Sequence, residues 1–147
     1  MKTLAIDIET YSGVDIKKGG IYPYAEAGDF EILLFAYAFD DEPVRVIDLA
    51  QGEALPGDVQ EALTDPDVLK TAYNAAFERR CLAQWLGIAL PVKQWECTMV
   101  KAAMLGMPFG LDAVGKVLQL EQGKMSEGKL LIRYFCMPCK PTRTNGG

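Results

Sequence analysis

The chain has 147 residues, of which 50% are hydrophobic and 24% charged, and its formal net charge is −5. These values are typical of one soluble globular domain with a real core, and no apolar run reaches the roughly 20 residues of a membrane-spanning helix. With no signal-peptide pattern at the N-terminus, we expect a cytoplasmic protein without a membrane partner.

The first part of the chain predicts three antiparallel strands. Residues 2–9 alternate between apolar and polar side chains, residues 30–39 are apolar and aromatic, and residues 44–49 return after a turn. Strands joined by short turns favour an antiparallel meander. The polar stretch 11–28 has no clear period, so we expect a long functional or mobile connector there.

The second part predicts helices alternating with strands. We expect helices at 56–63 and 75–86, with strands at 68–73 and 94–97. The helix over 75–86 should be capped by Asn74 and ended by Gly87, and its apolar stripe should consist of Phe77, Cys81, Leu82, Trp85 and Leu86. Thr98 is placed to cap a helix over 99–105, and further helices are expected at 111–118 and 126–135. The fold class is therefore α/β, with a mixed five-stranded sheet flanked by helices.

Two acids lie on the first predicted strand. Leu4, Ile6 and Ile8 face one way, whereas Asp7 and Glu9 face the other, which puts the two acids roughly 6.5–7 Å apart along the backbone. Paired carboxylates repel and lose solvation unless a cation lies between them, and hard ions such as Mg²⁺ or Mn²⁺ suit them. The other interpretation, an edge strand with a solvated polar face, has about equal weight.

A third acid lies where a strand meets a helix. Glu78 falls in the early turns of the helix that follows Asn74, and Phe77 is expected to pack that helix on the core. The helix macrodipole favours a carboxylate there, and the free N–H groups favour a phosphate. By itself, this segment is also an ordinary capped amphipathic helix.

The order of these motifs resembles the DEDD (DnaQ-like) 3′–5′ exonucleases, in particular the proofreading domain of phage and bacterial family A DNA polymerases. Asp7-Ile8-Glu9, followed by Thr10, matches the first motif, Asp-x-Glu. Asn74-Ala75-Ala76-Phe77-Glu78 matches the second, Asn-x-x-x-Phe-Asp, with one residue fewer and Glu in place of Asp. Residues 95–106 and 111–113 are also similar to the stretch that follows it, and the resemblance covers nearly the whole chain.

The resemblance implies a ribonuclease-H-like fold and hydrolysis of single-stranded DNA from its 3′ end with two Mg²⁺ (or Mn²⁺) ions. It implies that Asp7 bridges both ions, Glu9 holds the water-activating ion, and Glu78 supports the second, directly or through water. Thr10 and Asn74 would help hold the terminal nucleotide, and Phe77 is assigned either to this binding site or to packing.

The third motif of that family, Tyr-x-x-x-Asp or His-x-x-x-x-Asp on a late helix, does not match. The chain has no histidine, and Pro108 lies four residues before its last aspartate, Asp112. Tyr11 and Asp15 have the Tyr-x-x-x-Asp spacing but lie beside the first motif. We therefore expect residues 1–147 to be one domain truncated before its last catalytic helix, weak or inactive alone, and open to self-association or to a downstream polymerase domain.

Two further features carry less information. Cys136-Met137-Pro138-Cys139 supplies two thiols where structural zinc needs four ligands, so free thiols are expected at these positions and at Cys81 and Cys97. Residues 1–67 carry a net −11 and residues 68–147 a net +6. The basic end favours a DNA-backbone track and an ordinary solvated surface equally; its basic residues are Lys124, Lys129, Arg133, Lys140 and Arg143.

Two alternative functions remain. One is a catalytically inactive nucleic-acid-binding or structural remnant of such a domain, which the missing fourth acid favours. The other is a ribonuclease-H or resolvase-type endonuclease, which also begins with an acid on its first strand but fits Asn-x-x-Phe-Glu poorly.

Overall fold

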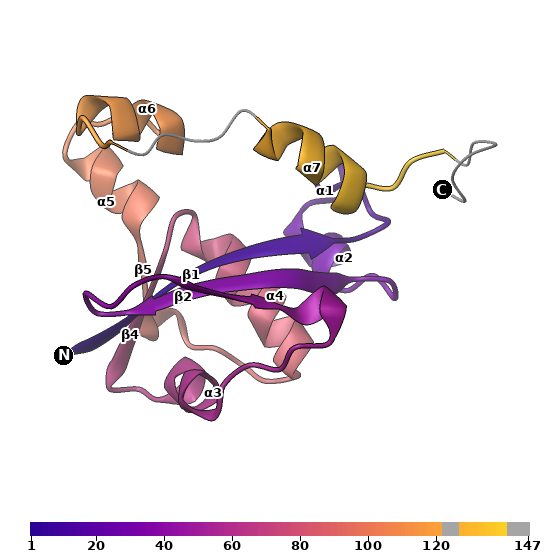
Figure 1. Cartoon of the computed structure of the whole chain (residues 1–147), viewed down its shortest axis with the longest axis horizontal. Helices are drawn as coiled ribbons and strands as arrows, with labels where there is room; N and C mark the ends of the chain where they lie inside the picture. Colours follow the sequence, from indigo (N-terminus) through magenta and orange to yellow (C-terminus); the bar gives the residue numbers. More distant parts are fainter. Residues whose placement is uncertain (122–126, 141–147) are drawn as a thin grey trace.

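A computed structural model describes residues 1–121 and 127–140 of the chain. Its centre is a five-stranded sheet with strand order β3-β2-β1-β4-β5 (Figure 1). The strands are β1 (Lys2–Tyr11), β2 (Glu31–Phe39), β3 (Arg45–Asp48), β4 (Val68–Ala72) and β5 (Trp95–Cys97). The predicted α/β class with a mixed sheet is confirmed.

Strand directions follow the connections between the strands. β1, β2 and β3 pair antiparallel, as the short turn between β2 and β3 allows, whereas β4 runs parallel to both β1 and β5. The parallel pairs need crossover connections, and these contain α3 (Gly57–Thr64) between β3 and β4 and α4 (Ala75–Leu86) between β4 and β5.

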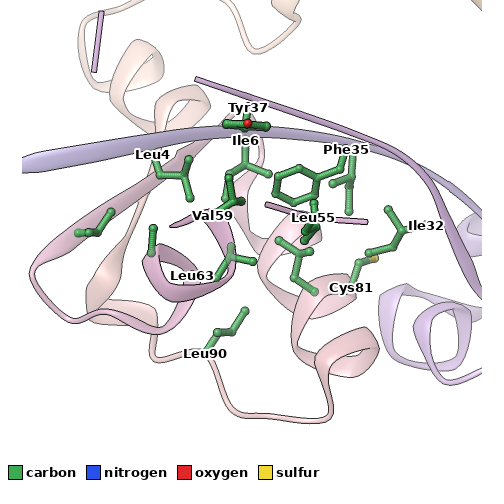
Figure 2. Close-up of a cluster of buried hydrophobic side chains, with 14 of the residues drawn as sticks. Leu4, Ile6, Ile32, Phe35, Tyr37, Leu55, Val59, Leu63, Cys81 and Leu90 are labelled. Carbon is green, nitrogen blue, oxygen red and sulfur yellow. The ribbon is translucent and has the colours of Figure 1, made fainter. Parts of the chain in front are cut away.

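The core lies between one face of the sheet and helices α3 and α4 (Figure 2). Leu4 and Ile6 of β1 point into it together with Phe35 of β2, and they meet Val59 of α3 and Cys81 of α4. The period of two along β1 therefore sends its alternate residues, including both acids, toward the other side of the sheet.

The last three helices lie on that other side (Figure 1). They are α5 (Thr98–Met104), α6 (Leu111–Val117) and α7 (Gly128–Phe135). Many of their large apolar side chains are exposed. Ser126, the expected first residue of the last helix, and the basic residues Lys124 and Arg143 fall outside the described residues. None of the described helices is long and apolar enough to cross a membrane.

The connector predicted over 11–28 is wrong in part, because it contains the short helices α1 (Ile16–Gly19) and α2 (Ile21–Ala25). Such short helices are too brief to show a helical period in the sequence. Two 3₁₀ turns also join the larger elements, Leu49–Gln51 and Val92–Gln94.

Three local predictions are corrected. Asn74 adopts a left-handed conformation with φ 71° and makes no capping hydrogen bond through its side chain. Thr98 lies inside α5, and its hydroxyl donates to the carbonyl oxygen of Ala72 at 3.1 Å instead of capping. Trp85, expected on the apolar stripe of α4, is 40% exposed, whereas Cys81 and Leu82 are fully buried.

Candidate active site

The two acids of β1 lie where the sheet opens on one side. β4 pairs with β1 only from Lys2 to Ala5, whereas β2 accompanies β1 to its end. From Asp7 onward, the β4 side of β1 therefore has no neighbouring strand, and the chain turns there from β4 into α4. Asp7 is exposed and Glu9 half-buried.

Glu78 projects from the first turn of α4 and is only 4% exposed. Its Oε2 atom has no hydrogen-bond partner among the residues that the structure describes. Burial, together with a smaller contribution from the charge of Asp7, raises the pKa of Glu78 from 4.5 to about 8. Asp7 and Glu78, 71 residues apart in the sequence, thus come close enough to repel each other, at the gap beside β1.

Glu9 meets a different element. The thiol of Cys136, directly after α7, donates to Glu9 Oε2 at 3.8 Å. Burial raises the pKa of Cys136 to about 11, and the Glu9 carboxylate adds to the rise. The thiol is therefore protonated at neutral pH, and the end of α7 lies against the acidic side of β1.

The remaining predicted residues support this arrangement from the core side. Thr10 is 5% exposed, and its hydroxyl lies 2.8 Å from the hydroxyl of Tyr24. Phe77 is partly buried against the core and its ring centroid is 6.1 Å from that of Tyr24. The packing role of Phe77 is confirmed. Asn74 contributes its backbone, since its carbonyl oxygen accepts from the Phe77 N–H at 2.9 Å.

Sequence reasoning missed Tyr24 and Cys136 as neighbours of the acids. Both contacts depend on how segments far apart in the sequence fold together, and Tyr24 lies in a helix that the sequence did not predict. No local pattern marks either residue.

The donor atoms of Asp7, Glu9 and Glu78 suit a divalent metal ion. The three carboxylates are the oxygen donors that Mg²⁺ and Mn²⁺ prefer, and a buried, unpartnered carboxylate oxygen with a raised pKa is one that a cation would stabilise. Within residues 1–121 and 127–140, however, no group of three or more His, Cys, Asp and Glu side chains is arranged to hold one ion. The convergence of all three acids on one ion therefore stays a prediction.

A surface hollow of about 550 Å³ lies elsewhere, along the second half of α4 and the segment after it. Arg79 and Arg80 line it, but Arg79 donates to the carbonyl oxygen of Leu90 at 3.0 Å, and Arg80 pairs with Glu26 and lies over the ring of Tyr22. Asp7, Glu9 and Glu78 are not among the residues that line it. The hollow is therefore separate from the acids.

No family model matches the chain. Over 146 residues it is 60% identical to a DNA polymerase of Bacillus phage SP02, a match that covers 99% of this chain and 22% of the relative. The chain thus spans about a fifth of the length of that relative.

Solved structures with the same fold are nucleases. Brucella melitensis NrnC aligns with a TM-score of 0.60 at 18% identity, over 84% of this chain and 55% of that chain. Escherichia coli RNase D, an exoribonuclease involved in structured RNA processing, aligns with a TM-score of 0.58 at 19% identity, over 86% of this chain and 30% of that chain. Trypanosoma brucei RNase D in complex with RNA U12 gives a TM-score of 0.62 at 19% identity, over 88% and 43%.

These findings confirm the resemblance stated from the sequence. The chain is homologous to part of a phage DNA polymerase, and its mixed sheet has the ribonuclease-H-like fold of DEDD-type exonucleases.

Proposed function

We propose that the chain is the 3′–5′ exonuclease domain of a DNA polymerase, of the proofreading type, which hydrolyses single-stranded DNA from its 3′ end with divalent metal ions. The observation that carries the proposal is the buried carboxylate of Glu78 beside Asp7, at the open edge of the strand that also bears Glu9. A protein without a cation to bind gains nothing from this pairing, since burial and repulsion both cost stability.

Asp7, Glu9 and Glu78 would hold the metal ions, with Asp7 bridging two of them. Two bound divalent ions supply an activated water and charge stabilisation at the leaving 3′-oxygen. Glu78 would bind as a carboxylate, so it must lose the proton that burial favours. Thr10 and the backbone around Asn74 would border the terminal nucleotide, and Phe77 holds the start of α4 in place.

DNA is proposed as the substrate because the relative at 60% identity is a DNA polymerase. The nucleases with the same fold include an exoribonuclease, and one of them is described with bound Mg²⁺. Because these nucleases share only the fold with the chain, at 17–19% identity, the preference for DNA over RNA rests on the polymerase relative.

We also propose that the site is completed by a fourth carboxylate outside residues 1–147, next to a downstream polymerase domain. Exposed apolar side chains on α5, α6 and α7, and on the segments next to these helices, make up a surface that such a domain would cover. This surface, called the apolar face below, consists of Val100, Met104, Leu105, Phe109, Leu111, Val117, Leu118, Leu120, Leu130, Leu131, Tyr134, Phe135 and Met137.

A second candidate, a domain that binds nucleic acid without cleaving it, is favoured by one contact. Cys136 occupies one oxygen of Glu9, and a protonated thiol at that position competes with a metal ion for the carboxylate.

A digestion assay separates the candidates. Single-stranded DNA and RNA of one sequence, labelled at the 5′ end, are incubated with excess protein and increasing Mn²⁺. A slow ladder that shortens one nucleotide at a time on DNA, and that Asp7→Asn abolishes, supports the exonuclease. Internal cuts would indicate the endonuclease instead, and binding without any metal-dependent product would indicate the inactive domain.

A further inference from the structure

Tyr24, on the short helix α2, joins the two segments that carry the acids. Its side chain is 7% exposed, its hydroxyl lies 2.8 Å from the hydroxyl of Thr10, and its ring centroid is 6.1 Å from that of Phe77. Thr10 directly follows Glu9, and Phe77 directly precedes Glu78. The Tyr24 side chain therefore contacts Thr10, next to Glu9 on β1, and also Phe77, next to Glu78 on α4.

The end of β1 is held on α2 by a second bond as well. The hydroxyl of Ser12, fully buried, donates to the carbonyl oxygen of Tyr24 at 2.9 Å. Thr10 in β1 and Ser12 directly after its end, both buried, are thus both bonded to Tyr24. Buried polar groups cost stability unless they are hydrogen-bonded. The two hydrogen bonds to Tyr24 therefore favour one position of residues 10–12 against α2.

The sheet is irregular at the same point. Glu9 pairs with Leu34 but Thr10 pairs with Ile32, so β2 has one extra residue, Leu33, opposite the junction of Glu9 and Thr10. A bulge of this kind bends the strand pair and increases its local twist, which changes the direction of nearby side chains. The regular strand pairing is interrupted next to Glu9, so it does not by itself fix the direction of the Glu9 side chain.

A tyrosine is needed here for its hydroxyl as well as for its ring. The ring packs edge-on against Phe30 at 5.9 Å and near Phe77, contacts that a phenylalanine would keep. Burial raises the pKa of Tyr24, and Glu9 is one of the charges that add to the rise. The hydroxyl thus stays protonated, close to Glu9, with Thr10 as its partner.

We propose that Tyr24 is a positioning residue, whose hydroxyl holds Thr10 at the bulge and thereby directs the Glu9 carboxylate toward the metal site. The inference rests on the proposed function, since it assumes that Glu9 binds a metal ion. It adds a residue from a third segment, α2, to the two acid-bearing motifs.

The test measures Mn²⁺ binding by electron paramagnetic resonance on the full chain, well below the unfolding temperature. Tyr24→Phe and Thr10→Val each remove one partner of the bond, and each should weaken Mn²⁺ binding about fivefold, the effect of one lost hydrogen bond. The double variant should be no weaker than either single one, because both remove the same bond. Thr10→Ser keeps a hydroxyl and should therefore weaken Mn²⁺ binding less than Thr10→Val does.

Tyr22→Phe is the matched control on the same helix. It removes an exposed hydroxyl and keeps the ring over which Arg80 lies, so Mn²⁺ binding should not change. Amide hydrogen exchange gives a readout without metal: Tyr24→Phe should speed exchange around Glu9 and Thr10 but not at Leu4.

Each result has a distinct meaning. Wild-type binding that Asp7→Asn abolishes, together with unchanged binding or unchanged exchange in Tyr24→Phe, would overturn the positioning role and leave the proposed function intact. Wild-type protein that binds no more Mn²⁺ than Asp7→Asn would overturn the proposed function, and the positioning role with it.

Discussion

Glu78 shows how the fold changes the chemistry of one residue. An ordinary glutamate is ionised at neutral pH, whereas burial and the charge of Asp7 raise the pKa of this one to about 8. At pH 7 Glu78 therefore keeps its proton, and a cation must displace this proton to bind. A site of this kind gains affinity for divalent ions as the pH rises.

The first prediction concerns pH and stability. Because the pKa of Glu78 is higher in the folded protein than in the unfolded chain, the folded state holds an extra proton between about pH 4.5 and 8. The free energy of unfolding should therefore fall across this window as the pH rises, by an amount on the order of a few kcal/mol. Glu78→Gln should flatten this dependence and be more stable than the wild type at pH 8.

Urea unfolding at pH 5, 6.5 and 8 measures the effect. Glu61→Gln is the matched control, since Glu61 is an exposed glutamate on a helix. The same pH dependence in wild type and Glu78→Gln would show that Glu78 is not the titrating group.

The second prediction concerns metal linkage. Under the proposed function Mn²⁺ binds only the folded state, so millimolar Mn²⁺ should raise the unfolding temperature at pH 8 by a few degrees. Asp7→Asn should remove most of the rise, because Asp7 is the proposed bridging ligand. Asp67→Asn, an exposed control beside β4, should keep it. Thermal unfolding with and without Mn²⁺ checks this, and an equal rise in Asp7→Asn would argue against a site at β1.

Among the helices and strands, α7 ends in a contact with an acid that the sequence did not predict. Its exposed apolar side chains contrast with the half-buried Cys136 that follows it and contacts Glu9. The helix therefore ends at the proposed site even though most of its side chains are exposed.

The third prediction follows from this contact. Cys136→Ala should strengthen Mn²⁺ binding severalfold, because the Glu9 carboxylate loses a partner that competes with the ion. Cys139→Ala, three residues on and exposed, should leave binding unchanged. Weaker binding in Cys136→Ala alone would mean that the thiol supports the site instead of competing for it.

How far the elements could be predicted depended on their length and period. β1, with alternating side chains, and α4, with Gly87 in a left-handed conformation at its end, follow from the sequence because each carries its own signal. The helices α1 and α2 have only four and five residues, which is too short for a period to appear. The contact between Tyr24 and Thr10 was hidden for this reason.

Lys70 marks another limit. It occupies a core-facing position of β4 and is fully buried, with its ammonium donating to the carbonyl oxygens of Asp65 and Val68 and to the side chain of Gln94. Lysine is almost never fully buried without such partners, and the partners come from three different segments. The sequence predicted Asp7, Glu9 and Glu78 as candidate site residues, but only the fold gives the burial of Glu78.

At the scale of the whole molecule, the apolar face is the main feature without a covering among the described residues. Large apolar side chains exposed in such number on neighbouring segments are typical of interaction sites. We propose that a downstream polymerase domain packs on the apolar face. Without that domain, the apolar faces of different copies of the chain should pack against one another.

The fourth prediction is therefore self-association. Sedimentation velocity should show a monomer that converts to dimers or larger species as the protein concentration rises through the micromolar range. Leu131→Lys with Phe135→Lys should shift the chain to monomer. Val46→Lys, an equally exposed apolar position on the edge strand β3, should not. A wild-type chain that stays monomeric at high concentration would contradict this use of the apolar face.

The central claim is that Asp7, Glu9 and Glu78 form the catalytic site of a 3′–5′ exonuclease. The most direct measurement places this chain in the Bacillus phage SP02 DNA polymerase, in exchange for the region that it matches at 60% identity, and follows 5′-labelled single-stranded DNA with Mn²⁺. We predict a ladder of products shortened from the 3′ end, lost with Asp7→Asn or Glu78→Gln while DNA synthesis is retained. A ladder that persists in both variants, or none from a chimera that still synthesises DNA, would contradict the assignment.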